Sequence, residues 1–460
     1  MNYISTRGGA SPAGFADVLL GALAPDGGLY LPDTWPRAHD FGFSSEDRYQ
    51  DVACTILQAF AAEATSASDL RDDIAAAYDS FAHPDVAPLV ELEPGLHLLE
   101  LFHGPTLAFK DVALQLLARL MARELERRKT WATILVATSG DTGSAAIAAF
   151  GGLPRVQIFV LHPQGRVSEV QRRQMTTAAQ ANIHNIALTG SFDDAQALAK
   201  TLFADRAFSR AQSLTAVNSI NFVRIVAQSV YYFTASAKLD ARACFVVPTG
   251  NFGDIFAAEA ASRMGLPVSG LVAATNANDI LARALNDGVY ASREALSTLS
   301  PSMDIQVASN FERALFEASS RDRLWVSQAM QEFSRSHRMQ IPPAVLANLR
   351  ARYQAVSVSD EETMEVISDT WRRYGRLVDP HTAVGLAAAR RTTTGTDTPT
   401  VVLATAHPAK FPETVSRATG MVPPLPRGLE QSYLGVERFS VLPNEARGLR
   451  AFIESRSAIP

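Results

Sequence analysis

The sequence predicts an α/β fold with mostly parallel sheets, and two observations support this prediction. Short apolar runs at 133–137, 156–161, 244–248 and 400–404 have the length and composition of buried parallel strands. Most of these runs lead through a turn into a segment with helical periodicity. Such alternation of strands and helices is typical of α/β proteins.

Two further regions read as mainly helical. Residues 1 to about 88 form a small helical unit, and Pro84 and Pro88 mark its end. Residues 310–375 are charged and lack obvious strands, so we expect a helical insertion there. Outside the α/β core, helices are predicted at 15–24, 49–63, 68–81 and 444–455.

Composition excludes several classes of protein. At 460 residues the chain is too long for one simple core, and 47% hydrophobic with 19% charged residues is typical of soluble globular proteins. The net charge is −5 and no basic block is present, which argues against nucleic-acid binding. Cys54 and Cys244 form neither a metal motif nor a disulfide framework, and a reducing cytoplasm fits them. We expect no signal peptide and no membrane span, since the most apolar run, 225–237, is too short.

The stretch 101–111 places one lysine at the start of a predicted helix. The chain has only five lysines, and Lys110 follows the apolar residues 107–109. Residues 111–128 have helical periodicity, so Lys110 lies at or just before a helix N-terminus. The helix dipole and partial burial favour the neutral amine, which can act as a base or form a Schiff base.

Two glycine-containing loops each connect a predicted strand to a helix. In open α/β sheets, ligands bind at this end of the strands. The loop 137–144 offers hydroxyls and backbone N–H groups to an anion. The loop 248–254 carries Gly250 and Gly253, whose backbone can form a nest for a phosphate. Its glycine spacing is neither that of a Rossmann fingerprint nor that of a P-loop.

Two more polar segments complete the set of candidate sites. In 217–224, Arg224 falls in the first turn of a helix, where a cation opposes the helix dipole. An anion held between that helix end and the guanidinium removes this conflict. The segment 404–411 follows a strand, which places the Thr405 hydroxyl where it can contact a ligand.

Together these motifs resemble the threonine synthase family, whose members use pyridoxal phosphate and have a tryptophan-synthase-β-like fold (fold type II). The resemblance covers essentially the whole chain. The small N-terminal unit and the helical insertion are similar to the longer subfamily of bacteria and fungi. The motifs that carry it lie at 5–8, 26–32, 102–111, 139–143, 218–221, 250–254, 309–313, 379–381 and 405–411.

The resemblance implies a division of the chain. It implies an N-terminal domain at 1–88 and a two-subdomain catalytic core of mostly parallel sheets at 89–425. Within this core a mobile subdomain spans about 130–217. A C-terminal segment follows at 426–460.

The resemblance also implies roles for individual residues. Lys110 is the catalytic residue and carries the cofactor as a Schiff base. The remaining cofactor contacts implied are Asp141 near the phenolic oxygen, Thr405 at the pyridine nitrogen, and Gly250, Asn251, Phe252 and Gly253 at the phosphate. The implied substrate-binding residues are Ser139, Thr142, Asn218, Ser219 and Arg224, the last three near the substrate phosphate. No metal is implied.

The implied reaction converts O-phospho-L-homoserine and water to L-threonine and phosphate in a monomeric or homodimeric cytoplasmic enzyme. Two alternatives stay open at this point. A phospho-lyase on the same scaffold releases 2-oxobutyrate and needs the same lysine and phosphate pocket. A catalytically silent protein of the same fold is expected to lack the lysine or the glycine loop, and this chain has both. A serine or threonine dehydratase has no need of the anion site at 218–224.

Overall fold

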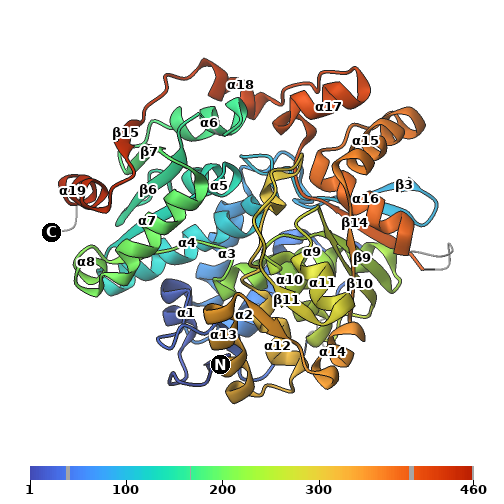
Figure 1. Cartoon of the computed structure of the whole chain (residues 1–460), viewed down its shortest axis with the longest axis horizontal. Helices are drawn as coiled ribbons and strands as arrows, with labels where there is room; N and C mark the ends of the chain where they lie inside the picture. Colours follow the sequence, from blue (N-terminus) through green and yellow to red (C-terminus); the bar gives the residue numbers. More distant parts are fainter. Residues whose placement is uncertain (38–41, 166, 393–397, 458–460) are drawn as a thin grey trace.

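The computed structural model describes residues 1–37, 42–165, 167–392 and 398–457 and contains two large sheets (Figure 1). The chain is an α/β protein with mostly parallel sheets, as the sequence predicts. No helix in these ranges is long and apolar enough to cross a membrane.

The first large sheet has five strands in the order β15-β7-β6-β5-β8, and all neighbouring pairs are parallel. Its strands are β5 (Ala132–Ala137), β6 (Val156–Pro163), β7 (Ile183–Thr189), β8 (Leu214–Thr215) and β15 (Ser440–Pro443). The accompanying helices are α5 (Asp141–Phe150), α6 (Glu169–Thr176), α7 (Phe192–Ala204), α8 (Arg206–Ala211) and α19 (Ala446–Arg456). The predicted strands at 133–137 and 156–161 and the final helix are confirmed.

The second large sheet has six strands in the order β13-β10-β9-β14-β4-β3 and is parallel except for the pair of β3 with β4. Its strands are β3 (Leu89–Glu93), β4 (Leu96–Glu100), β9 (Ala243–Pro248), β10 (Val268–Thr275), β13 (Tyr353–Ser357) and β14 (Thr400–Ala404). Nearby helices are α10 (Gly253–Arg263), α11 (Ile280–Asp287), α15 (Asp360–Tyr374) and α16 (Pro380–Thr392). The predicted strands at 244–248 and 400–404 are both in this sheet.

The region 310–375 corrects one expectation from the sequence. It is mainly helical, but it also holds β13, which extends the second sheet by pairing with β10. Its short strand β12 (Arg338–Gln340) pairs with β11 (Val289–Ala291). These strands are only three to five residues long, so they leave no clear periodic pattern in the sequence. The helices of the region are α12 (Phe311–Ala318), α13 (Arg323–Ser336), α14 (Pro343–Arg350) and α15.

The N-terminal residues form the predicted helical unit. Its helices are α1 (Phe15–Gly21), α2 (Tyr49–Ala61) and α3 (Ala67–Tyr78). The first two lie inside the ranges expected from the sequence, and α3 begins one residue before its expected range. Two three-residue strands, β1 (Tyr3–Ser5) and β2 (Tyr30–Pro32), pair antiparallel and were not predicted. Two helices near the C-terminus, α17 (Pro412–Thr419) and α18 (Arg427–Leu434), complete the chain.

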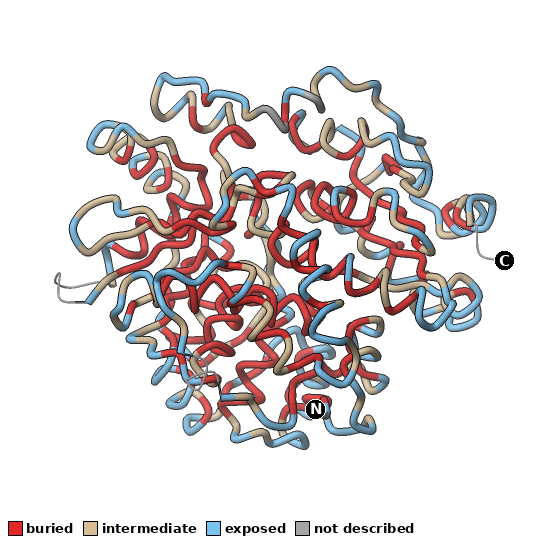
Figure 2. The backbone as a smooth tube through the Cα atoms, turned by 180° about the vertical axis from the view of Figure 1, so that it is seen from behind, coloured by how far each residue is buried: buried red, intermediate tan, exposed pale blue. Residues whose placement is uncertain are grey.

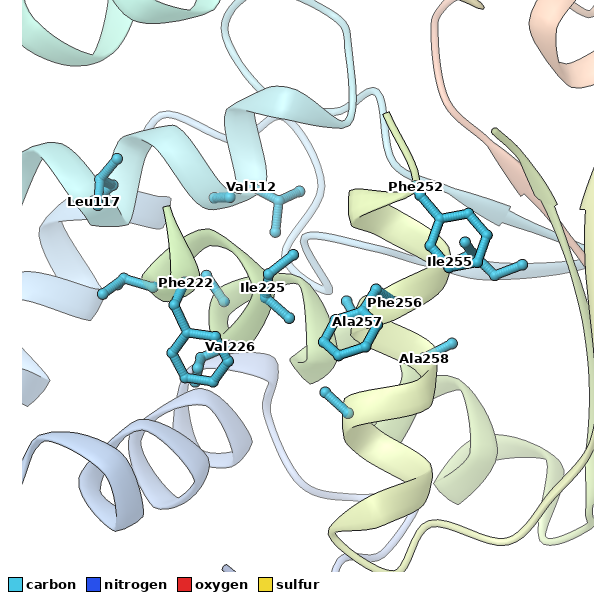
Figure 3. Packing of buried hydrophobic residues seen from close by; sticks show 14 of the residues in the cluster. Val112, Leu117, Phe222, Ile225, Val226, Phe252, Ile255, Phe256, Ala257 and Ala258 are labelled. Carbon is cyan, nitrogen blue, oxygen red and sulfur yellow. The ribbon is translucent and has the colours of Figure 1, made fainter. Parts of the chain in front are cut away.

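Three helices form the centre of the core. They are α4 (Lys110–Arg128), α9 (Phe222–Leu239) and α10, and Figure 3 shows Val112, Ile225 and Phe256 from these helices within one cluster of buried apolar side chains. Every residue of α9 from Phe222 to Ser236 is buried. Buried residues run through the middle of the molecule, and exposed ones form its outer loops (Figure 2). The N-terminal ends of α4, α9 and α10 are therefore held by a rigid interior.

Candidate active site

Lys110 is the first residue of α4, as the sequence predicts, and hydrogen bonds fix the backbone that leads to it. The backbone N–H of Phe109 donates to the carbonyl oxygen of Thr405 at 2.8 Å, and that of His407 donates to Leu107 at 3.0 Å. An isolated antiparallel bridge joins Ala108 to the same strand end. The segment after β14 therefore lies against the approach to Lys110, which places Thr405 beside it.

The side chain of Lys110 faces a buried carboxylate. Its Nζ lies 3.4 Å from Oδ2 of Asp141, the first residue of α5. A second lysine, the buried Lys410, lies 2.7 Å from Oδ1 of the same residue. Ser302 donates from Oγ to Oδ2 at 2.8 Å, and Gln171 donates from Nε2 to Oδ1 at 3.0 Å. The carboxylate therefore has four donors from four separate segments of the chain.

These contacts determine the charge states at the site. Burial by itself raises the pKa of Asp141, but Lys410 and Lys110 outweigh it and hold that pKa well below its usual range. Burial lowers the pKa of Lys110; Lys410 and Arg224 lower it further, and Asp141 opposes them. An ionised carboxylate thus lies beside an amine that releases its proton more readily than an exposed lysine.

The loop between β9 and α10 is shaped by its glycines. A Cβ on Gly250 would lie 3.0 Å from both the carbonyl oxygen of Ser302 and Cδ1 of Ile305. Phe252 is the N-cap residue of α10 with a φ of 63°, and it has no side-chain acceptor for the first N–H groups of the helix. The free donors at this helix start favour an anion.

Phe252 and Asn251 serve the loop in different ways. The Phe252 ring is buried and packs edge-on against Phe311 at 5.2 Å between ring centroids, so only its backbone is available to a ligand. The carbonyl oxygen of Asn251 accepts hydrogen bonds from the backbone and side chain of Asn310 at 3.0 and 3.1 Å. Asn310 therefore anchors the loop from the start of α12.

The loop before α9 ends in a buried arginine. Arg224 donates from Nη1 to the carbonyl oxygen of Val217 at 3.2 Å, and its buried Nε has no hydrogen-bond partner among the described residues. Burial lowers the Arg224 pKa to about 10. Asn221 caps α9, with its Oδ1 accepting from the backbone N–H of Val223 at 3.0 Å. A buried guanidinium with an unused donor is a candidate anion site.

The remaining predicted substrate-binding residues differ in burial and in their contacts. Ser139 lies in the loop before α5 and Thr142 in the first turn of α5, on either side of Asp141, and both are partly buried. The carbonyl oxygen of Ser219 accepts from Asn310 at 3.1 Å, which places this residue next to the glycine loop. Asn218 is exposed, and its Oδ1 accepts from the backbone N–H of Ile220 at 3.3 Å within its own turn.

Several residues at the site have no role predicted from the sequence. Lys410, Ser302 and Gln171 all contact Asp141. His381 accepts at Nε2 from the backbone N–H of Ser302 at 3.2 Å. The rarity of lysine in the chain was a usable signal for Lys410. Ser302 lies in no motif, so it left no signal in the sequence.

The N-terminal unit contacts the elements that carry the site. Asn221 donates from Nδ2 to the carbonyl oxygen of Leu19 at 2.9 Å. Thr6 donates to Glu312 in α12 at 2.6 Å, and Arg7 forms an ion pair with the same carboxylate at 2.7 Å. The unit therefore supports α12 and the loop before α9.

Comparison with known proteins gives consistent matches along the chain. Residues 2–78 match the family model "Threonine synthase N terminus", 86–352 match "Pyridoxal-phosphate dependent enzyme", and 382–453 match "Threonine synthase, C-terminal". A threonine synthase of Pseudomonas aeruginosa is 47% identical over 98% of each chain. A solved structure described as pyridoxal-phosphate-bound threonine synthase from Brucella melitensis is 47% identical over all of both chains, with a TM-score of 0.95. The yeast threonine synthase structure is 36% identical over 99% of this chain and 98% of its own, with a TM-score of 0.93.

Proposed function

The chain belongs to the threonine synthase family of pyridoxal-phosphate-dependent enzymes with fold type II, and from this premise we propose the substrate and the roles of its site residues. The substrate is a small molecule. The proposed reaction converts O-phospho-L-homoserine and water to L-threonine and inorganic phosphate.

The site residues fit pyridoxal phosphate. Lys110 offers a largely buried amine with a lowered pKa, as a Schiff-base lysine requires. The loop Gly250–Gly253 at the start of α10 suits the cofactor phosphate, because its backbone is open and the helix end attracts an anion. Asp141 is assigned to the phenolic oxygen side and Thr405 to the pyridine nitrogen. Bound at this position, the cofactor supplies an electron sink for charge that develops at the substrate's Cα.

The observation that carries the choice of substrate is the unpartnered Nε of buried Arg224. Its charge is close enough to lower the pKa of Lys110. A second anion-binding group near the amine suits a substrate with its own phosphate, and the start of α9 adds N–H donors. Ser139, Thr142, Asn218 and Ser219 are proposed as further substrate contacts.

Lys110 is proposed to move protons at the substrate. Its neutral side chain would take the proton from Cα, a Cβ proton would be lost as phosphate leaves Cγ, and protons would return to Cγ and finally to Cα. Arg224 and the α9 N-terminus stabilise charge on the departing phosphate. Water adds at Cβ to give threonine.

Product analysis tests this function against its closest alternative. Purified protein with the cofactor and O-phospho-L-homoserine is expected to release threonine and phosphate in equal amounts. Release of 2-oxobutyrate and ammonia without threonine would indicate a phospho-lyase, and no turnover would indicate a catalytically silent protein. Lys110→Ala should remove all product, whereas Lys200→Ala, an exposed lysine in α7, is the matched control.

We also propose the domain boundaries, the oligomeric state and the compartment of the protein. We infer an N-terminal domain at 1–88, a catalytic core at 89–425 with a mobile subdomain at about 130–217, and a C-terminal segment at 426–460. A monomer or homodimer in the cytoplasm is the proposed state. Light scattering after size-exclusion chromatography measures the oligomeric state.

A further inference from the structure

Two lysines, the buried Lys410 and the partly buried Lys110, share the carboxylate of Asp141. Lys410 lies in the short 3₁₀ helix Pro408–Lys410 and is completely buried. Its Nζ is 2.7 Å from Asp141 Oδ1, whereas Nζ of Lys110 is 3.4 Å from Oδ2. Lys410 also donates to the carbonyl oxygen of Thr106 at 2.9 Å. The tighter ion pair therefore belongs to Lys410 and not to Lys110.

This arrangement changes the charge that Lys110 meets. A buried ammonium is costly unless it is paired, and among the described residues Asp141 is the acidic partner within ion-pair distance of Lys410. The pair of Asp141 and Lys410 is neutral as a whole, so its attraction for a cation at Lys110 is weak. Without Lys410, the same position beside Lys110 would hold an uncompensated negative charge.

We propose that Lys410 is a positioning residue for the reaction: by pairing with Oδ1 it holds Asp141 ionised, weakens the ion pair between Asp141 and Lys110, and leaves the Lys110 nitrogen free to exchange protons. This inference rests on the proposed function of Lys110. It assigns a role to a side chain on a segment far from Lys110 in the sequence.

The charged and titratable groups around this pair come from several elements. Asp141 faces Lys110, Lys410 and His381. Lys110 also faces Arg224 and Asp254. Lys410 further faces Asp111 and His407. Each of these groups is kept in the variants below except where it is the one replaced.

The experiment measures proton binding at the lysine-bound cofactor in the absence of substrate. The visible absorbance band of the holoenzyme is titrated against pH for wild type, Lys410→Met, Lys410→Arg and the control Lys200→Met. In Lys410→Met the bare Asp141 charge favours the protonated form, so the titration midpoint should rise by about one pH unit or more. Lys410→Arg and Lys200→Met should keep the wild-type midpoint. A Lys410→Met midpoint that is unchanged or lower overturns the inference.

A second pair of variants tests whether the effect passes through Asp141. In the Asp141→Asn background, the carboxylate through which Lys410 is proposed to act is absent, so adding Lys410→Met should shift the midpoint far less. Equal shifts in both backgrounds would show a direct effect and overturn the role as a positioning residue. If Lys410→Met does not fold, Lys410→Gln replaces it, because glutamine keeps a donor for the carbonyl oxygen of Thr106. This variant is also expected to raise the titration midpoint.

The outcomes separate this inference from the proposed function. Borohydride reduction followed by peptide mass analysis locates the cofactor on the chain. If the wild-type protein carries no cofactor at Lys110, both the proposed function and the role of Lys410 are overturned. A wild type that carries it at Lys110 but titrates like Lys410→Met overturns the role of Lys410 alone.

Discussion

Arg313 donates a hydrogen bond from Nη2 to the backbone carbonyl oxygen of Ile220 at 2.7 Å. This bond joins α12 to the loop before α9. The same buried guanidinium donates from Nε to the carbonyl oxygen of Tyr30 in the N-terminal unit at 3.1 Å. One side chain thus links the N-terminal unit, the insertion and a loop of the candidate active site.

Replacing Arg313 should therefore destabilise the whole chain. Arg313→Met leaves two buried carbonyl oxygens without their donor, so the free energy of unfolding should fall by about 3 kcal/mol. Urea denaturation followed by circular dichroism measures this. Arg335→Met, an exposed arginine in α13, is the matched control. A loss no larger than that of the control would contradict the structural role of Arg313.

Lys110 is predicted to hold the cofactor covalently. Lys110→Arg keeps a positive charge but cannot form the Schiff base, so the visible absorbance band should disappear. Turnover should fall by at least about 10³-fold. Absorbance spectra and product assays on the same preparation measure both effects. A visible band that survives the substitution would show that another residue holds the cofactor.

Gly250 is predicted to be needed for the phosphate loop. An added Cβ lies 3.0 Å from the backbone oxygen of Ser302, so Gly250→Ala must displace the loop. We expect cofactor affinity to fall about tenfold, near the lower end of the cost of overpacking. Equilibrium titration of the apoenzyme with pyridoxal phosphate measures this affinity. Gly448→Ala, a helical glycine with open space around its Cβ position, should bind as wild type does.

Arg224 is predicted to act on the substrate phosphate and not on the cofactor. Arg224→Met removes a charged donor, so KM for O-phospho-L-homoserine should rise by roughly 10- to 100-fold. Cofactor occupancy should stay at the wild-type level. Steady-state kinetics and absorbance measure the two quantities. If the variant lost cofactor to the same extent as it lost substrate affinity, Arg224 would instead act on the cofactor phosphate.

His407 is predicted to make stability depend on pH. Burial lowers its pKa to about 4 from an ordinary 6.5, so the unfolded chain binds the proton more tightly than the folded one. The contribution of neutral His407 to the free energy of unfolding is fully present above pH 6.5 and is lost as the pH falls toward 4.

His407→Asn tests this pH dependence, since asparagine can still accept the hydrogen bond from Ala409. Between pH 7 and pH 5, wild type should lose about 2 kcal/mol relative to this variant. Denaturation at the two pH values measures the difference. A difference that does not change with pH would contradict the neutral, buried state of His407.

Part of the fold could be predicted because four of its strands are mainly apolar runs. The strands β5, β6, β9 and β14 and the helices α4 and α10 left clear periodic patterns in the sequence. Other strands of the two large sheets, such as β7, β10, β13 and β15, were not predicted, because polar residues or glycine interrupt them or because they are short. They are stabilised by pairing with neighbouring strands of the sheet. Pairing of this kind leaves little trace in local sequence.

Some residues of the candidate site could be predicted from the sequence and others could not. Lys110 and the glycine loops stand out because a lysine after an apolar run, or glycines between a strand and a helix, are local patterns. Ser302 and Gln171 are ordinary polar residues in their own segments. They become part of the site only because the chain brings them to Asp141 from more than 150 and about 30 residues away.

The sequence by itself determined the α/β class, the helix that begins at Lys110 and the loops that can hold anions, since all of these follow from local periodicity and turn chemistry. Only the tertiary structure decided which charges meet. It placed Lys410 nearer than Lys110 to the carboxylate of Asp141, and it left the buried Nε of Arg224 without a partner among the described residues. The physical reason is that electrostatic energy depends on distance and burial in space, and separation along the chain does not specify either.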